Sequence, residues 1–179
     1  NVGGLIGYHV NGGTVKTSSA RGNVSTSGNS VGGLVGYIVS SETDINDSYA
    51  RGDVTTSGSS VGGLIGRGSG EVANVYASGR VEGGGNNVGG LVGLGGGQLS
   101  DAYWDRGATA QTDATGSGTP IGATGYGSIS DNAPAPRMQG RAATAFMPEL
   151  NYTRTWNATR GYPVLQAQTS GTGQSPRAV

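Results

Sequence analysis

The hexapeptide Val-Gly-Gly-Leu-(Val/Ile)-Gly occurs four times and constrains the fold more than any other feature of the chain. The copies begin at Val2, Val31, Val61 and Val88, which gives periods of 29, 30 and 27 residues. Three further apolar columns follow at fixed spacing; they are Val15, Ile45, Val72 and Leu99, then Ala20, Ala50, Ala77 and Trp104, then Val24, Val54 and Val81. Self-similarity at such periods is typical of repeat architectures in which each unit stacks on the next.

The repeat favours strands over helices. Its apolar runs are short, β-branched and bracketed by glycine, and 37 of the 179 residues are glycine. Each glycine would cost a helix about 1 kcal/mol. Three strand-like pieces can be named per repeat, for example residues 31–36, 45–50 and 53–56. We therefore predict an all-β fold, a right-handed parallel β-solenoid of about four coils of 27–30 residues with a roughly triangular cross-section.

Stacked coils would place equivalent side chains over one another at about 4.8 Å. We predict three structural ladders. They are a valine ladder of Val2, Val31, Val61 and Val88, a leucine ladder of Leu5, Leu34, Leu64 and Leu91, and a tyrosine ladder of Tyr49, Tyr76 and Tyr103. Exposed tyrosines could instead bind glycans, but a ladder that stabilises the strands is favoured. Glycine is expected at corners with positive φ and where backbones approach closely.

Valine and leucine lie three positions apart in the hexapeptide, so a flat strand would direct them to opposite faces. Either the Gly-Gly pair bends the chain, or both faces of the strand are covered. The sequence leaves both alternatives open.

The hexapeptide, followed by Ile45-x-x-Ser48-Tyr49-Ala50-x-Gly52-x-Val54, resembles the GLUG-motif repeat. This repeat occurs in large bacterial surface and secreted proteins, including filamentous-haemagglutinin-like adhesins exported by two-partner secretion. The resemblance covers residues 1 to about 105, and the motifs at 102–105 and 161–165 resemble the region that closes such arrays. It implies an extracellular or bacterial cell-surface location and a stalk or adhesive role, and it implies no catalytic residues.

The chain divides into three parts in this interpretation. Residues 1–106 hold the solenoid repeats, 107–168 form a cap over the open solenoid end, and 169–179 form a flexible tail. Within the cap we expect a short helix over 137–147, ended by Pro148. The expected cap core consists of Phe146, Leu150, Trp156, Tyr162 and Leu165.

Composition excludes several classes of partner and cofactor. The 11 basic and 11 acidic residues balance, so phosphate neutralisation offers no basis for binding nucleic acid. No apolar run approaches the length of a membrane span. Cysteine is absent and His9 is the single histidine, so we expect no disulfide and neither a metal nor another cofactor. The acidic segment 42–47 lacks the spacing of a calcium loop and is expected to be solvated.

The expected partners follow from the open repeat and from the resemblance. The chain begins at a repeat motif without a cap, so we expect preceding repeats, or another copy of the chain, to stack on that edge. A receptor or a glycan of a host or neighbouring cell is the other expected partner.

Two features could indicate an enzyme. His9 lies in the variable loop after the first hexapeptide and is expected to face solvent. Asp47 and Asp101 share a column with Thr17 and Asn74, and two coils would separate their backbones by about 9.6 Å, near the roughly 6.5–9.5 Å between the carboxyl groups of inverting glycosidases. A turn that prefers short polar residues explains this column better.

We therefore predict a non-catalytic structural or adhesive segment of a large exported bacterial surface protein. A carbohydrate-active solenoid enzyme and a self-assembling filament subunit are the alternatives.

Overall fold

The computed structural model describes residues 1–95, 97–118, 121–131 and 133–169. Short strands recur in each coil. The first coil contains β1 (Val2–Gly3), β2 (Ile6–His9), β3 (Gly13–Lys16), β4 (Ser19–Ala20) and β5 (Val24–Thr26), and the second contains β6 (Val31–Gly32), β7 (Val35–Ile38), β8 (Thr43–Asn46), β9 (Tyr49–Ala50) and β10 (Val54–Thr56). The third contains β11 (Val61–Gly62), β12 (Ile65–Arg67), β13 (Glu71–Ala77) and β14 (Val81–Gly83), and the fourth β15 (Val88–Gly89), β16 (Val92–Leu94) and β17 (Leu99–Asp105).

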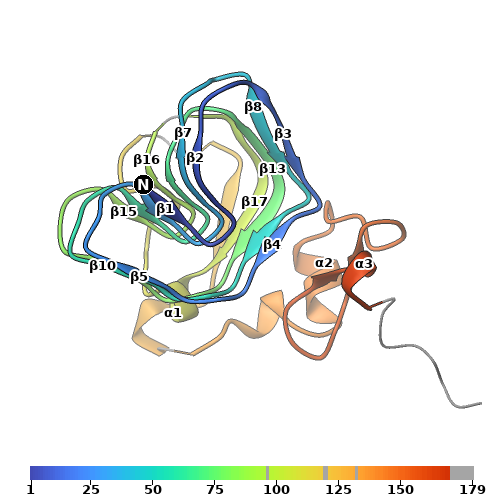
Figure 1. Ribbon diagram of the computed structural model, residues 1–179. Coiled ribbons are helices and arrows are strands. Elements are labelled where there is room, and N and C mark those ends of the chain that lie inside the picture. The colour runs from blue at the N-terminus through green and yellow to red at the C-terminus, as the bar shows by residue number, and fades with distance from the viewer. Residues whose placement is uncertain (96, 119–120, 132, 170–179) are drawn as a thin grey trace, which may run out of the picture.

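Strands of successive coils pair in parallel, in the register that the sequence columns predict. Val2 pairs with Val31, Val31 with Val61, and Val61 with Val88. The sheet orders β1-β6-β11-β15, β2-β7-β12-β16 and β5-β10-β14 repeat this stacking. In Figure 1 the chain runs clockwise as it recedes from the viewer, which is a right-handed winding. The predicted parallel β-solenoid of about four coils is confirmed.

The cross-section is two-lobed, not triangular as the three strand pieces per repeat suggested. Figure 1 shows a larger lobe bounded by β2, β3 and β4 beside a smaller lobe bounded by β5 and β10, with the β1 row between them. Each lobe has its own core. Val31, Val54 and Val61 belong to the small core, whereas Leu34 and Leu64 belong to the large one. The β1 row is thus a wall with both faces covered.

The Gly-Gly pair bends the chain as well, so both alternatives left open by the sequence apply. A Cβ at Gly32 would overlap the carbonyl oxygen of Val35, which follows the bend in the same coil. A Cβ at Gly33 would overlap Gly63 of the next coil. Here glycine is required by the close approach of backbones.

Within the coils, positive φ angles occur mainly at short polar residues, which agrees with the turn predicted for the column of Asp47 and Asp101. Thr17, Asp47, Asn74 and Asp101 occupy one such corner, with φ between 47° and 54°. Ser30, Ser60 and Asn87 occupy a second corner directly before the hexapeptide. Asn and Asp tolerate this conformation better than most residues.

The C-terminal part begins as a continuation of the solenoid. It contains α1 (Arg106–Thr109), β18 (Ala123–Tyr126), the 3₁₀ turns η1 (Ile129–Asp131) and η2 (Pro136–Met138), α2 (Ala142–Phe146), β19 (Trp156–Asn157), β20 (Val164–Leu165) and α3 (Gln166–Thr169). Strand β18 pairs in parallel with β17, and the amide of Leu91 donates to the carbonyl of Ala114 at 2.8 Å. Residues 113–118 and 121–126 therefore belong to a partial fifth coil.

Residues 133–169 leave the solenoid axis and pack against its side. Figure 1 shows α2 and α3 beside β4, next to the coils instead of stacked on their last turn. The helix expected over 137–147 is shorter, because Gly140 adopts φ 59° and separates η2 from α2. Of the predicted flexible tail 169–179, only Thr169, the last residue of α3, lies within the described residues.

Candidate functional site

The tyrosine ladder lies on the outer face of the sheet that contains β9, β13 and β17. Tyr49 and Tyr76 stack with ring centroids 4.9 Å apart and an interplanar angle of 4°. Tyr49 and Tyr76 have no exposed surface and Tyr103 is 5% exposed. These rings are therefore not available to a glycan.

The C-terminal segment covers this ladder. Trp156 packs against both Tyr49 and Tyr76, with ring centroids 5.7 Å apart in each case. The shared core also contains Ala135, Met138, Ala143, Met147, Leu150, Tyr162 and Leu165. The Tyr76 hydroxyl donates to the carbonyl oxygen of Pro163 at 2.6 Å. Burial raises the pKa of Tyr76 well above its ordinary value, so the ring remains neutral inside this interface.

Asp105 joins the last full coil to the C-terminal segment, a role that sequence reasoning missed. The residue is fully buried. Its carboxylate accepts hydrogen bonds from the amide of Ala108 at 2.9 Å, the amide of Ala135 at 2.5 Å and the hydroxyl of Tyr162 at 2.6 Å. Burial, followed by the hydrogen bond to Asp105, raises the pKa of Tyr162. The sequence contains one signal for this role. Asp105 directly follows Trp104, which occupies an apolar column, and a carboxylate buried at that place needs hydrogen-bond donors from other residues.

The C-terminal segment also reaches the first coil. Gln168 in α3 donates to the hydroxyl of Ser19 and accepts hydrogen bonds from Arg21 and from the hydroxyl of Tyr49. Ser19 occupies the first position of the tyrosine column, since it pairs with Tyr49. The segment therefore spans the coils from the last to the first.

The expected cap core needs one correction. Leu150, Trp156, Tyr162 and Leu165 are buried, but Phe146 is 39% exposed. Ala143 in the short helix α2 and Met147 directly after the helix are buried, which leaves Phe146 on the other face. Its ring instead contacts the edge of Tyr126 and lies under the guanidinium of Arg137.

The first coil forms an open edge. Strands β1, β2, β3, β4 and β5 each pair on one side only. Leu34, Leu64 and Leu91 are fully buried, whereas Leu5 in the same ladder is 50% exposed because no described residue stacks on that side. Val2 is half-buried for the same reason, and Val31 and Val61 are fully buried.

The side chains considered as catalytic candidates, those of His9, Asp47 and Asp101, lie in regular features of the coils. His9 is half-buried in β2, with Nδ1 3.3 Å from the hydroxyl of Thr43. Asp47 and Asp101 lie at the left-handed corner described above. Among the described residues, His, Asp and Glu form no group of three or more that could hold a metal ion.

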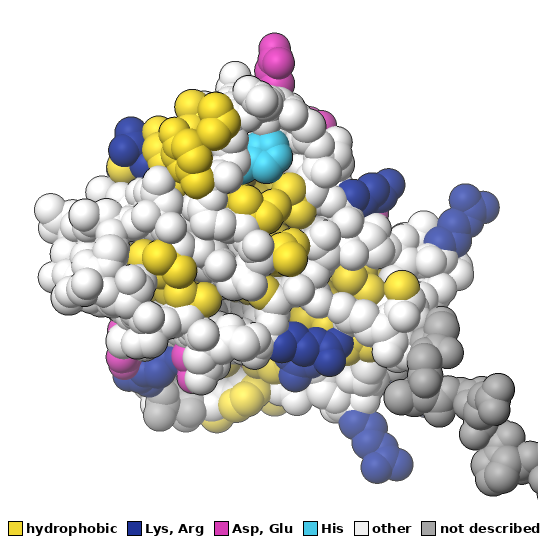
Figure 2. Space-filling model, in the orientation of Figure 1, with side chains coloured by type: hydrophobic (Ala, Val, Ile, Leu, Met, Phe, Trp, Pro, Cys, Tyr) yellow, Lys and Arg dark blue, Asp and Glu magenta, His cyan; other side chains and the backbone are white. Residues whose placement is uncertain are grey.

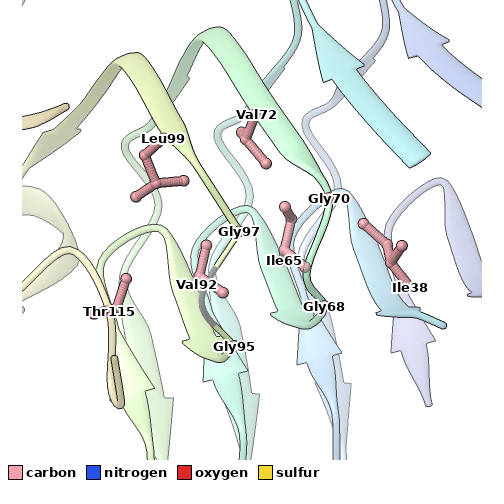
Figure 3. Close-up of a pocket in the computed structure, with 10 residues that line it drawn as sticks. All are labelled: Ile38, Ile65, Gly68, Gly70, Val72, Val92, Gly95, Gly97, Leu99 and Thr115. Atoms are coloured by element: carbon pink, nitrogen blue, oxygen red, sulfur yellow. The ribbon is translucent and has the colours of Figure 1, made fainter. Parts of the chain in front are cut away.

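An apolar cavity lies inside the larger lobe, between the sheets of β12 and β13 (Figure 3). Ile38, Ile65, Val72, Val92 and Leu99 line it, and glycines of the loops after β12 and β16 form one wall. Its volume is about 10 Å³, which is about the space of one water molecule. It is a packing defect and has no room for a ligand.

Comparison with known proteins agrees with the stacked coils. Residues 57–82 match the GLUG motif. The chain therefore contains a GLUG repeat. It is 63% identical to Halomucin of Haloquadratum walsbyi over 179 residues, which is 99% of this chain.

The chain spans only 2% of the length of that relative. No solved structure gives a significant match. Among the described residues, no helix is long and apolar enough to cross a membrane.

Proposed function

We propose that this chain is a non-catalytic structural segment of a larger exported surface protein, located outside the cell or on its surface. The observation that carries the proposal is that the side chains which could act in catalysis or binding make structural contacts instead. The hydroxyls of Tyr76 and Tyr162 and the carboxylate of Asp105 bind the C-terminal segment to the coils, and short polar residues form corners of the coils. The GLUG match and the similarity to a much longer Halomucin support a repeat segment within a large protein.

The open edge suggests how such a segment is joined to its neighbours. Unpaired N–H and C=O groups along five strands, with Leu5 half-exposed above them, suit the addition of another parallel coil. We propose that preceding repeats stack there and continue the ladders. Stacking of a second copy, as in a filament, is the alternative.

The location can be tested by labelling intact cells that produce the parent protein with an antibody against this chain. We expect intact cells to be labelled as strongly as permeabilised ones. Labelling that requires permeabilisation would contradict the proposal.

The enzyme alternative requires a separate test, because Asp47 and Asp101 share a column. The purified chain is incubated with a panel of polysaccharides beside the double variant Asp47→Asn with Asp101→Asn. We expect no turnover by either protein. Turnover that the double variant abolishes would overturn the structural interpretation.

The filament alternative predicts a particle size that grows with concentration. Light scattering over a range of concentrations distinguishes it from stacking within one polypeptide. We expect a constant size.

We further propose that exposed faces of the coils contact a receptor or glycan of a host or neighbouring cell, which is an adhesive role. This part is independent of the stacking, because binding to a side of the solenoid needs no open edge.

A further inference from the structure

A second column of large side chains runs along the solenoid, on the outer face of the sheet β2-β7-β12-β16. It consists of Tyr8, Tyr37, Arg67 and Leu94, one from each coil, which pair in register. We call this set the outer stripe. Tyr8 is 52% exposed, Arg67 is exposed, and Tyr37 and Leu94 are half-buried.

The outer stripe differs from the tyrosine ladder in that no described segment packs over it. Figure 2 shows hydrophobic side chains gathered over β2 and β7, with a basic side chain at their border. Val10 and Val39, which follow β2 and β7, are 51% and 43% exposed and extend this apolar surface. Large exposed apolar patches of this kind mark interaction sites.

The members of the stripe hold one another in place. The rings of Tyr8 and Tyr37 have centroids 5.5 Å apart with an interplanar angle of 60°. The guanidinium carbon of Arg67 lies 5.0 Å from the centroid of Tyr37. Arg67 makes no ion pair with a carboxylate among the described residues. Its charge is therefore available to an anionic ligand.

A groove adjoins the stripe. Tyr37, Val39, Arg67, Ser69 and Leu94 line it, and its volume is about 280 Å³. Gly68 and Gly95 also line it, so at these two positions no side chain narrows the groove. The volume is close to the roughly 300 Å³ at which ligand pockets begin, and the lining residues come from three successive coils.

We propose that the outer stripe and its groove bind an acidic glycan that runs along the solenoid axis. Tyrosine offers a flat apolar face to the sugar rings and a hydroxyl at its tip. The guanidinium of Arg67 pairs with a carboxylate of the glycan, since guanidinium and carboxylate groups can form two parallel hydrogen bonds. Ser69 supplies a hydroxyl for a further hydrogen bond. A column one side chain wide suits a linear chain better than a protein partner, which needs about 800 Å² on each side.

This inference rests on the adhesive part of the proposed function and names its ligand class. It is tested with oligogalacturonate, a linear chain of carboxylate sugars, and with a neutral dextran oligosaccharide of equal length. Binding to the whole chain is measured by calorimetry at low and at high salt. We expect oligogalacturonate to bind, more weakly at high salt, and dextran to bind at least about fivefold more weakly.

Two variants locate the site. Arg67→Gln is expected to weaken oligogalacturonate binding by about fivefold and to remove most of its salt dependence. Tyr37→Ala is expected to weaken it by about tenfold, because it removes the aromatic face against which a sugar ring packs. Arg137→Gln is the matched control, because Arg137 also lies 5.0 Å from an aromatic ring, that of Phe146, but in the C-terminal segment. It should bind as the parent chain does.

Three results would overturn the inference. They are no binding of oligogalacturonate by the parent chain, equal binding of dextran, and equal losses in the Arg67 and Arg137 variants. Circular dichroism on the same samples distinguishes the absence of a glycan site from the absence of the solenoid fold. A folded chain that binds no glycan removes the ligand site but leaves the structural role, whereas a chain that lacks β-structure contradicts both.

Discussion

The coils and the C-terminal segment reach their structures by different routes. In the coils, a residue has nearly the same neighbours as its equivalent one repeat away, as the register of Val24, Val54 and Val81 shows. Residues 133–169 have no such period. Their core forms largely against another surface, the rings of Tyr49 and Tyr76. The coils therefore stabilise one another, whereas the C-terminal segment depends on the coils.

The largest effect is expected from a glycine between two coils. A Cβ at Gly52 would overlap the carbonyl oxygen of Gly22 in the coil before it. Because two backbones would have to separate, we expect Gly52→Ala to lower the free energy of unfolding by more than about 4 kcal/mol, measured by urea titration.

Gly22 is the matched control, since it occupies the same column in the first coil and a Cβ there would meet nothing within 4 Å. Gly22→Ala should change stability by less than about 0.5 kcal/mol. Equal losses in the two variants would mean that the coils do not stack as described.

The next effect concerns the dependence of the C-terminal segment on the coils. Trp156→Ala removes the fully buried ring that contacts Tyr49 and Tyr76. We expect a loss of about 3 kcal/mol, with a changed near-ultraviolet circular dichroism spectrum and a retained far-ultraviolet β signal. Phe146→Ala, at a 39% exposed position, should cost far less. Loss of the β signal on Trp156→Ala would show that the coils depend on the segment instead.

Asp105 tests the junction between the two regions. Asp105→Asn replaces an acceptor of three hydrogen bonds by an amide that places a donor beside other donors. We expect a loss of about 2 kcal/mol, measured by thermal unfolding. Asp53→Asn is the control, because Asp53 is exposed and accepts one amide hydrogen bond. Similar losses in both variants would contradict a special role for Asp105.

The smallest effect is expected from alkaline pH. Burial, with a smaller contribution from the charge of Asp101, raises the pKa of Tyr103 from 10.0 to about 12. A tyrosine whose folded pKa exceeds its unfolded value contributes stability below pH 10 that is lost as the pH rises through 12. We expect urea midpoints to fall over this interval, and Tyr103→Phe to reduce the slope. An unchanged slope would show that Tyr103 ionises as freely as in the unfolded chain.

The spacing of Val-Gly-Gly-Leu and the columns that follow it predicted the strands, their parallel pairing and their register, because one residue pattern recurs in each coil. The two-lobed section could not be predicted in the same way. It depends on the contact between Gly32 and the backbone of Val35. The sequence alone does not distinguish a glycine that is required by a close approach of backbones from one that is required by a turn.

The position at which the C-terminal segment packs was harder still to predict from the sequence. Its large apolar residues predicted a core, but an open solenoid end and the tyrosine column were both surfaces that needed cover. Only the structure shows that Trp156 packs on the column. The outer stripe was missed for a related reason, because its column changes from Tyr37 to Arg67 and so does not repeat one residue type in the sequence.

Engineered disulfides test the register of the coils most directly, because the chain has no cysteine of its own. Ser25 pairs with Thr55, and Thr55 with Glu82, and all three side chains are exposed. Neighbouring coils place paired Cα atoms about 5 Å apart, within the range that a disulfide spans, whereas two coils place them about 10 Å apart. Stacking in register predicts rapid oxidation of S25C with T55C and none within the molecule for S25C with E82C. Equal yields in both pairs, or no bond in the first, would contradict the account.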